Sequence, residues 1–321
     1  MVYDVRPIIV ISKCLGFEPC RYNGGIEKND FIDNLKQFVD FITVCPEVDS
    51  GFTIPRDTLK IVQLNDKLEL VQPKTGEIVT DKIINFSEKF LGELSDVDGF
   101  ILKTKSPTCG AKDAKIYLTI EKGAANRRGK GFFVQKIIDK YPNSIIEDEG
   151  RLTNFKIREH FLTRIYVLAS FRTAKKSEDK EELRKFHLKN SLLFLAYSHK
   201  YSKILDSLIF NDDSFNDKNL FVEYEKYLLK LLERAPRYTS NINVLLKSME
   251  QFKDKITQDE MQFIWNTIDK YKKGLVPFSV PLYLVKGYLI RFDLEYLLNQ
   301  SFFMPYPEEL IQVSDSGKLI H

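Results

Sequence analysis

The sequence of 321 residues is poor in cysteine and has no long apolar run. Its four cysteines, Cys14, Cys20, Cys45 and Cys109, all lie in the first third of the chain, which argues against a disulfide framework and favours reduced thiols or a metal centre. It contains no paired C-x2-C knuckle and no H-x3-5-H pair, which disfavours structural zinc. No apolar stretch approaches the roughly 18 residues of a membrane helix, and no signal peptide is recognisable, so we expect a cytoplasmic protein without membrane association.

Charge is nearly balanced over the whole chain but uneven along it. The formal net charge is +3, yet residues 151–210 carry 13 Lys and Arg against 6 Asp and Glu. A second basic stretch, residues 101–132, has eight basic residues opposed only by Asp113 and Glu121. Local basic patches of this kind suit a specific anionic partner, although lysine-rich helix faces often serve solubility alone.

The first 150 residues alternate short apolar runs with helical patterns. This alternation predicts an α/β fold with a Rossmann-like parallel sheet and flanking helices. The expected strands are residues 6–12, 42–44, 99–104 and 144–147, and the expected helices are residues 30–41, 83–94 and 131–140. Residues 57–81 alternate apolar and polar positions and predict a hairpin beside the sheet.

The periodicity of the sequence changes after Gly150, where helical spacing of Leu, Tyr and Phe begins. We therefore expect two domains, residues 1–150 and an all-α domain over residues 154–321, with a short junction between them. Beyond the first helical segments, further helices are expected at residues 219–234, 240–251, 258–271 and 280–299.

Three of the cysteines occupy the same kind of position. Cys14, Cys45 and Cys109 each follow a predicted strand, next to residues that turn the chain. The carboxyl ends of parallel strands meet at one edge of a sheet, so these thiols are expected to converge there as a metal centre. A single cysteine in such a place is more often a small apolar residue that ends a buried strand, but three are harder to explain in this way. Soft thiolates on three separate loops favour an iron–sulfur cluster.

Other reactive side chains lie close to these cysteines. Glu47 comes two residues after Cys45, and Ser106 comes three residues before Cys109. Arg21 and Arg56 add groups that could bind an anion or stack on a ring. Each has a structural alternative: Ser106 could cap a turn, Glu47 could be solvated, and Arg56 could pair with a nearby aspartate.

Four strings carry a resemblance to a known family. They are CLGFEPCRYNGG (14–25), VCPEVDSGFTIPR (44–56), ILKTKSPTCG (101–110) and IIEDEGRL (145–152), and together they resemble the thiouracil desulfidase (TudS) family. The helical remainder, with Arg158-Glu159-His160-Phe161 and Phe186-His187, resembles the YbgA-type domain that is fused to TudS-like domains. Proteins with both modules resemble desulfidases that act on 4-thiouridine in tRNA.

The resemblance implies a cofactor and roles for particular residues. It implies a [4Fe-4S] cluster held by Cys14, Cys45 and Cys109, with Cys20 outside the ligand set, and Glu47 and Ser106 as the catalytic carboxylate and hydroxyl. The implied reaction is a hydrolytic, non-redox cleavage of the C–S bond. The chain departs from the family at several positions, namely Asn23 for Asp, Thr108 for Ser, Lys60 for a Glu downstream of Arg56, Asn190-Ser191 for His-Lys, and Tyr197 for a His.

A tRNA substrate would need basic side chains along its phosphate backbone. The candidates are Arg21, Arg56, Lys103, Lys122, Arg127, Arg128, Lys130, Arg158 and Arg164, of which those at 122–130 lie in a glycine- and alanine-rich segment that is typical of a mobile loop. Two alternatives stay open. The same chemistry could act on free thiouracil or 4-thiouridine monophosphate, or the chain could be a non-catalytic, cluster-bearing module for RNA binding or redox sensing. The oligomeric state is not indicated.

Overall fold

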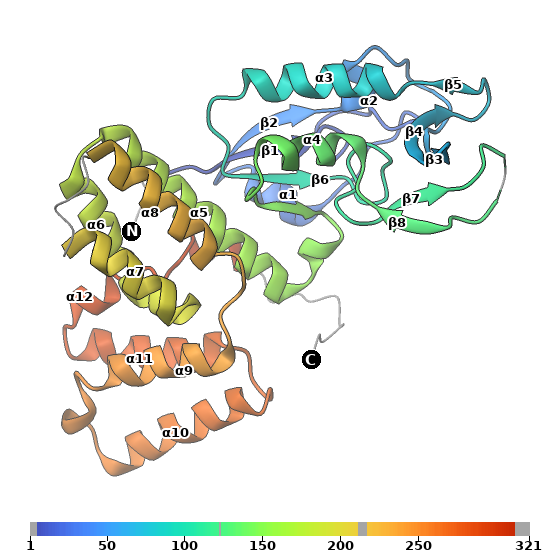
Figure 1. Cartoon of the computed structure of the whole chain (residues 1–321). Helices are drawn as coiled ribbons and strands as arrows, with labels where there is room; N and C mark the ends of the chain where they lie inside the picture. The colour runs from blue at the N-terminus through green and yellow to red at the C-terminus, as the bar shows by residue number, and fades with distance from the viewer. Residues whose placement is uncertain (1–4, 122, 211–216, 312–321) are drawn as a thin grey trace. The chain divides into compact units, whose positions relative to one another are not determined.

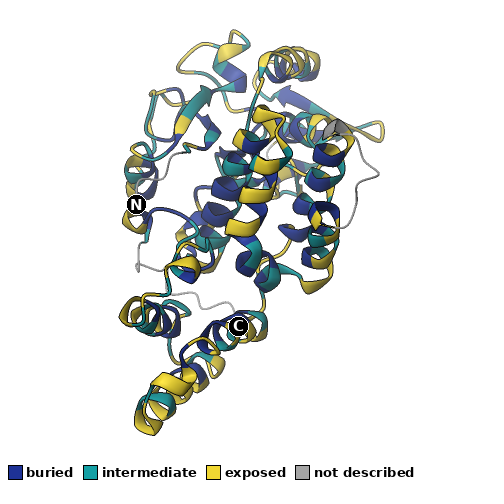
Figure 2. Cartoon of the chain, turned by 90° about the vertical axis from the view of Figure 1, so that its left-hand side faces the viewer, coloured by how far each residue is buried: buried dark blue, intermediate teal, exposed yellow. Residues whose placement is uncertain are grey.

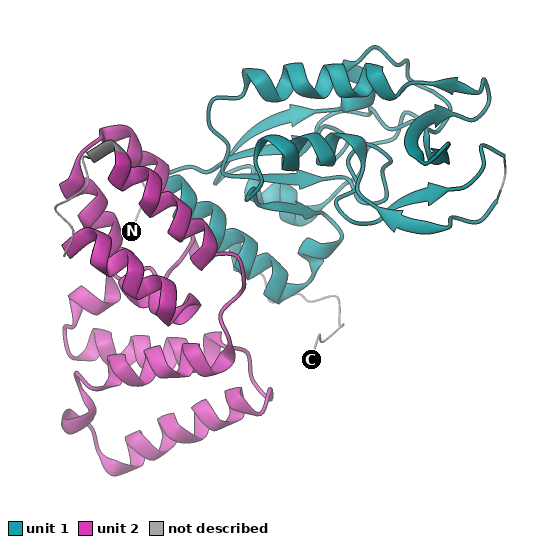
Figure 3. Ribbon diagram, viewed as in Figure 1, with its two compact units in different colours: residues 1–169, 309–321 teal, residues 170–308 magenta. Residues whose placement is uncertain are grey.

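The structure is a computed structural model that describes residues 5–121, 123–210 and 217–311 (Figure 1). The chain forms two compact units, one of residues 1–169 and 309–321 and the other of residues 170–308 (Figure 3). The boundary between the units falls inside one long helix, Phe155–Ser177, whereas the periodicity of the sequence changes earlier, at Gly150. A helix that continues from one unit into the next shows no change of periodicity at the boundary, so the pattern of the sequence gives no signal there.

A four-stranded parallel sheet forms the centre of the first unit, as predicted. Its strands stand in the order β2-β1-β6-β9 and span Ile8–Ser12 (β1), Asp40–Val44 (β2), Gly99–Leu102 (β6) and Ile146–Asp148 (β9). Val10 of β1 lies in register with Ile42 of β2 and with Phe100 of β6. All of β6 and nearly all of β1 are buried, which is typical of a parallel sheet covered on both faces.

Three helices flank this sheet. They are α1 (Asp30–Leu35), α3 (Thr80–Glu93) and α4 (Phe132–Lys140). Phe100 of β6, Leu91 of α3 and Phe133 of α4 belong to one buried apolar cluster. Burial of such side chains supplies most of the driving force that holds helices against a sheet. Helix α1 is shorter than the predicted helix over residues 30–41, because the chain turns after Leu35 to enter β2.

Residues 57–81, predicted as a hairpin, begin a second sheet with the strand order β5-β4-β3-β7-β8. Its strands are β3 (Lys60–Leu64), β4 (Lys67–Gln72), β5 (Glu77–Ile78), β7 (Ala114–Tyr117) and β8 (Arg127–Gly129). Asn65 and Asp66 form the two-residue β3–β4 turn, both with positive φ, which these residue types tolerate. The prediction of a mobile loop over residues 122–130 is wrong at 127–129, because β8 pairs antiparallel with β7.

The second unit is helical, as predicted. The helices from the end of the first unit onward are α5 (Phe155–Ser177), α6 (Lys180–Tyr197), α7 (His199–Phe210), α8 (Asp217–Leu231), α9 (Tyr238–Met249), α10 (Gln258–Lys272), α11 (Ser279–Arg291) and α12 (Glu295–Leu298). The predicted helix over residues 280–299 is divided at Asp293, whose φ is +53°. Figure 2 shows buried residues on one side of most helices and exposed residues on the other. No helix in the described part of the chain is long and apolar enough to cross a membrane.

His187 forms a buried polar centre in the second unit. Its Nδ1 atom lies 2.8 Å from Tyr224 Oη, and its Nε2 atom lies 2.8 Å from Asp206 Oδ1. The His187 side chain is 1% exposed, and burial lowers the pKa of the ring despite the opposing effect of Asp206. The neutral imidazole therefore links α6, α7 and α8, with both ring nitrogens in hydrogen bonds.

Candidate functional site

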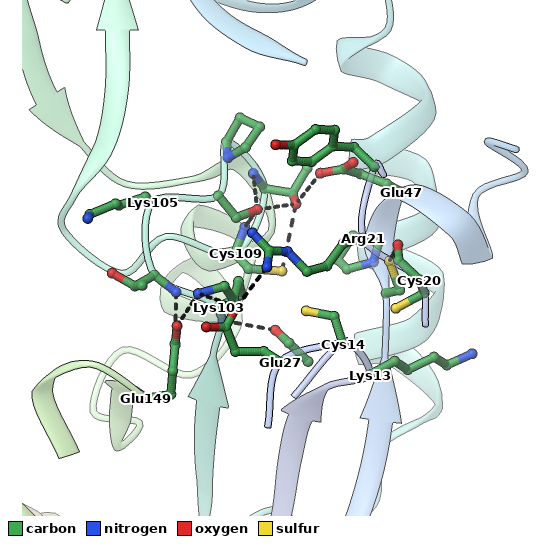
Figure 4. A pocket seen from close by; sticks show the side chains of 18 of the residues that line it. Lys13, Cys14, Cys20, Arg21, Glu27, Glu47, Lys103, Lys105, Cys109 and Glu149 are labelled. Atoms are coloured by element: carbon green, nitrogen blue, oxygen red, sulfur yellow. Dashed lines mark hydrogen bonds and ion pairs between the residues drawn. The ribbon is translucent and has the colours of Figure 1, made fainter. Parts of the chain in front are cut away.

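A cavity of about 720 Å³ lies at the carboxyl edge of the parallel sheet. Segments that follow β1, β2, β6 and β9 contribute to its wall, as the ends of neighbouring parallel strands are expected to do. All four cysteines line it, and Figure 4 shows the sulfur atoms of Cys14, Cys20 and Cys109 near one another. The structure thus brings together the three cysteines that were predicted to converge, and it adds Cys20, which the family resemblance leaves outside the ligand set.

The four thiols are free, and most are shielded from water. Burial raises the pKa of the Cys109 thiol to about 12. A hydrogen bond with Cys14, together with burial, raises the pKa of Cys20 to about 12, and a hydrogen bond with Cys20 raises the pKa of Cys45. These three thiols are therefore protonated near neutral pH in the metal-free chain. Binding of a metal centre must release their protons, and the positive charge of the metal then stabilises the thiolates.

The chemistry of this donor set fits a cluster better than a single ion. Among the described residues, no group of three or more His, Cys, Asp or Glu side chains is placed to hold one metal ion. A cluster of several irons draws its thiolates from a wider span than one ion does, and soft thiolates are its usual ligands. Four thiols on the wall of one cavity are suited to this arrangement.

The loop of Cys45 is fixed by the short helix α2 (Pro46–Asp49), which begins directly after this cysteine. Asp49 accepts a hydrogen bond from the backbone N–H of Cys45 at 2.9 Å, and Lys13 Nζ donates to the same carboxylate at 2.7 Å. Lys13 follows β1, so this ion pair ties the loop of Cys14 to the loop of Cys45. Proline at the first helical position favours the start of α2, because its fixed φ suits the helix.

Glu47, on α2, is a buried carboxylate with two partners. It is 8% exposed and lines the cavity. Arg56 donates from Nε to its Oε2 atom at 2.8 Å, and Thr108 donates from Oγ1 to its Oε1 atom at 3.1 Å. The Arg56 guanidinium also donates from Nη1 to the carbonyl oxygen of Cys20 at 3.1 Å. Arg56 therefore fixes both the carboxylate and the Cys20 segment, instead of pairing with a nearby aspartate.

Ser106 caps the turn that carries Cys109. Its Oγ atom accepts hydrogen bonds from the backbone N–H of Thr108 at 3.2 Å and of Cys109 at 3.0 Å. The same atom lies 3.0 Å from Thr108 Oγ1, so Thr108 links Ser106 to Glu47. In the sequence, Thr108 stands out only as a departure from the family. Its position between two predicted site residues was the signal that could have identified it.

Helix α4 begins against this turn. The backbone N–H of Phe133 donates to the carbonyl oxygen of Thr108 at 3.0 Å. A Cβ atom on Gly131 would lie 2.3 Å from that oxygen, which is closer than any side chain permits. Glycine is required here because the backbone of the turn passes directly over the start of the helix.

The opposite wall of the cavity holds a network of charged side chains. Lys103 Nζ pairs with Glu149, which follows β9, and lies 3.6 Å from Glu27 Oε2. Arg21 pairs with the same Glu27 oxygen at 2.9 Å. Glu149 is 6% exposed and also accepts a hydrogen bond from Thr104 N at 2.9 Å. Neither Glu27 nor Glu149 was predicted from the sequence, although Glu149 follows a strand of the parallel sheet and the ends of such strands meet at one edge.

The remaining predicted contacts lie elsewhere. Arg127, Arg128 and Lys130 are exposed on or beside β8 and are not among the residues that line the cavity, nor is Arg164 on α5. Lys122 lies outside the described residues. The prediction that Arg158 contacts phosphate is wrong, because this residue is only 3% exposed. Its Nη1 atom donates to the carbonyl oxygens of residues 152 and 153 at 2.9 and 3.3 Å.

Comparisons with known proteins match the two parts of the chain separately. The profile of a family described as 2-thiouracil desulfurase matches residues 9–149, and that of a protein family of unknown function, DUF1722, matches residues 191–307. The uncharacterized protein YbbK of Bacillus subtilis is 32% identical over 112 residues, which covers 32% of this chain and 74% of YbbK. The uncharacterized protein YbgA of Escherichia coli is 26% identical over 135 residues, which covers 42% of this chain and 79% of YbgA.

Among solved structures, a [4Fe-4S]-dependent thiouracil desulfidase, TudS, is 24% identical, with a TM-score of 0.38. The match covers 46% of this chain and 93% of the TudS chain. The two modules that the sequence resembles, a TudS-like part followed by a YbgA-type part, are both confirmed by the family profiles and the curated relatives.

Proposed function

The chain belongs to the 2-thiouracil desulfurase family, and we propose that it removes the sulfur of 4-thiouridine in tRNA. In this hydrolysis the oxygen of water becomes bonded to C4 of the base, the C–S bond breaks, and sulfur leaves as hydrogen sulfide, with no net oxidation or reduction. The observation that carries the proposal is that four thiols and the buried carboxylate of Glu47 line one cavity.

The proposed cofactor is a [4Fe-4S] cluster held by Cys14, Cys45 and Cys109. When bound, such a cluster with three protein ligands supplies an iron with a free coordination position, a Lewis acid with affinity for the soft sulfur of a thiocarbonyl. The support within this chain is the set of thiols on loops that follow adjacent parallel strands. Cys20 lies in the same cavity, so the choice of three ligands among four thiols belongs to the proposal.

Glu47 is the proposed general base. A carboxylate that takes a proton from water as the water attacks the base typically contributes about 10²- to 10⁴-fold to the rate. Thr108 and Arg56 hold one carboxylate oxygen each, which orients Glu47 in the cavity. Ser106 is proposed to act beside Glu47 as a hydroxyl that holds the ring or passes a proton through Thr108. Glu47 and Thr108 are buried, so the carboxylate has little contact with bulk water.

The tRNA substrate is the finer part of the proposal. A nucleotide of tRNA must leave its stack to reach a cavity of this kind. Basic side chains of residues 151–210, which outnumber the acidic ones there, would contact the phosphate backbone. The helical part, residues 154–321, would act as the RNA-binding domain. The place of action would be the cytoplasm, where thiols stay reduced and tRNA is present.

A free thiopyrimidine or its monophosphate is the second candidate substrate. All residues that line the cavity belong to the first unit, between Ser12 and Thr153. A small substrate would therefore find every wall of the cavity in the first unit alone. This observation favours the smaller substrate, whereas the presence of a helical unit with a basic segment favours tRNA.

The test begins with anaerobic purification and a count of iron and sulfide per chain. The protein is then incubated with thiolated tRNA, with 4-thiouridine monophosphate and with 4-thiouracil, and loss of the thione absorbance is followed. Turnover of tRNA at the highest kcat/KM supports the proposal, and preference for the monophosphate or the base supports the second candidate. If cluster-loaded protein consumes none of them, the desulfidase proposal is wrong and a non-catalytic, cluster-bearing module is the better description.

A further inference from the structure

Lys13 is joined to the loops of two proposed cluster ligands. It directly precedes Cys14, where the chain leaves β1, and its backbone N–H donates to the carbonyl oxygen of Val44 at 2.9 Å. Val44 is the last residue of β2 and directly precedes Cys45. The backbone therefore holds the turn after β1 against the turn after β2 at this point.

The Lys13 side chain makes a second connection between the same two loops. Its Nζ atom lies 2.7 Å from Asp49 Oδ1, and Asp49 Oδ2 accepts a hydrogen bond from the backbone N–H of Cys45 at 2.9 Å. Glu18 Oε2 lies farther from the same Nζ atom, at 4.0 Å, so Asp49 is the main partner. One carboxylate thus links the ammonium group beside Cys14 to the backbone of Cys45.

This ion pair is partly shielded from solvent. The Lys13 side chain is 19% exposed and the Asp49 side chain 23%, and Lys13 is one of the residues that line the cavity. Water and salt screen such charges less than they screen charges on an open surface, so the pair acts more strongly on its neighbours. Figure 4 shows the Lys13 side chain extending away from the sulfur atom of Cys14, so the ammonium group does not obstruct a metal at that sulfur.

The two charges of the pair act on a bound cluster in opposite directions. Three thiolates outweigh the positive charge of an oxidised [4Fe-4S] core, so the bound cluster is anionic, and an electron that it accepts adds more negative charge. A nearby ammonium group stabilises that charge and raises the reduction potential, whereas a nearby carboxylate lowers it. In the intact pair of Lys13 and Asp49 these two effects oppose each other.

We propose that Lys13 and Asp49 are positioning residues for the cluster, which hold the loops of Cys14 and Cys45 at the spacing that the cluster requires and keep the charge beside it balanced. This inference rests on the proposed function, because it takes these cysteines as ligands of a [4Fe-4S] cluster, and it deepens that function. Neither side chain touches the substrate in this assignment, since both act through the two cysteines. Removal of either charge should therefore weaken retention of the cluster, while the reduction potential should follow the sign of the charge that remains.

A small set of variants separates the two effects. Lys13→Met and Asp49→Asn each remove one charge and keep the approximate size of the side chain, the double variant removes both charges, and Lys13→Arg keeps the positive charge. Lys136→Met is the matched control, because Lys136 also forms an ion pair at 2.7 Å, with Glu88, but this pair joins α4 to α3. The control changes the net charge of the chain by the same amount as Lys13→Met.

The first measurement is the rate at which the anaerobically loaded, full-length chain loses iron to an excess of chelator. Loss of one charged contact should make this rate about tenfold higher in Lys13→Met, in Asp49→Asn and in the double variant. Lys13→Arg should restore most of the retention, and Lys136→Met should behave as the wild type. A wild-type rate in both single variants would overturn the proposal.

The second measurement is the reduction potential of the cluster, from a redox titration followed by electron paramagnetic resonance. Lys13→Met should lower the potential, Asp49→Asn should raise it, and the double variant should return close to the wild-type value. If one single variant does not fold, the sign of the shift in the other, compared with Lys136→Met, is the test.

A role of the pair in folding alone would shift the potential of both single variants in the same direction or in neither. That result would overturn the proposal, even if iron were lost faster. Opposite shifts in a protein that desulfurises no thiolated substrate would support the assigned role of Lys13 and Asp49 and would refute the proposed reaction.

Discussion

Thr108 donates a hydrogen bond from Oγ1 to Oε1 of Glu47 at 3.1 Å, although the two residues are 61 positions apart in the sequence. The same hydroxyl lies 3.0 Å from Ser106 Oγ. The proposed hydroxyl and the proposed carboxylate are therefore connected through a third side chain. Orientation of Glu47 should depend on the Thr108 hydroxyl as much as on Arg56.

Substitution Thr108→Val should lower kcat about 10- to 100-fold, because it removes a hydrogen bond to a charged group without changing the volume. Thr108→Ser keeps the hydroxyl and should stay within about threefold of the wild type. The measurement is kcat and KM on the preferred thiolated substrate, with iron content checked in each variant. A loss that appears only in KM, or an equal loss in both variants, would contradict a role in holding Glu47.

Substitutions of Glu47 and of Cys109 should distinguish loss of catalysis from loss of the cluster. Glu47→Ala should lower the activity about 100-fold or more and keep the brown colour of the cluster. The reason is that the proposed role of this carboxylate is to take a proton from water, not to bind iron. Cys109→Ala should lose the colour together with the activity. Visible absorption and iron per chain report the first property, and thione loss reports the second. Equal bleaching in both variants would show that the assigned roles are wrong.

The pair of Arg56 and Glu47 should contribute to stability as well as to orientation. Both side chains are largely buried, with 5% and 11% exposure, so Arg56→Met leaves an uncompensated carboxylate. The free energy of unfolding should fall by about 3 to 5 kcal/mol. Lys74→Met is a matched control, because the Lys74–Asp57 pair is exposed and should contribute no more than about 1 kcal/mol. Urea unfolding of the metal-free variants gives both values.

Stability of the helical unit should depend on pH through His187. Burial lowers the pKa of this histidine in the folded chain, whereas the unfolded chain keeps a value of about 6.5. Below that pH the unfolded state binds a proton that the folded state excludes, so the free energy of unfolding falls as the pH decreases towards the folded pKa.

The measurement is thermal or urea unfolding between pH 7.5 and 5 in wild type, His187→Gln and His199→Gln. His187→Gln should be less stable at pH 7.5 and should show a smaller decrease on acidification. His199 is exposed, so its variant should follow the wild type. An identical pH dependence in all three proteins would show that another group controls the acid sensitivity.

Periodicity and strand ends were sufficient to predict the parallel sheet and the meeting of Cys14, Cys45 and Cys109. The signals were local, because a buried strand followed by a turn is visible in a few residues. The β7 and β8 strands were missed because they are short and border glycine-rich or charged segments. The pairing of β7 with β3 of the hairpin joins segments far apart in the sequence, which no local pattern records, and β8 in turn pairs with β7.

Partners of the site residues could not be predicted from the sequence. Arg56 had several acidic candidates nearby, and the choice of Glu47 depends on the path of the chain between them. Arg158 looked like a surface cation, yet its guanidinium is buried on backbone carbonyls. Only three-dimensional packing distinguishes a basic residue that is already paired from one, such as Lys105, that is exposed and forms no ion pair with the residues that the structure describes.

The start of α4 against the Cys109 turn also determines where the chain tolerates change. Because a Cβ atom at Gly131 would overlap the Thr108 carbonyl, even alanine there must displace the turn that carries a proposed cluster ligand. In a survey of all single substitutions, Gly131 should therefore be as intolerant as the cysteines, although it is not among the residues that line the cavity. Inactivating variants at this glycine would report a misplaced loop, and they should not be counted as evidence for contact with the substrate.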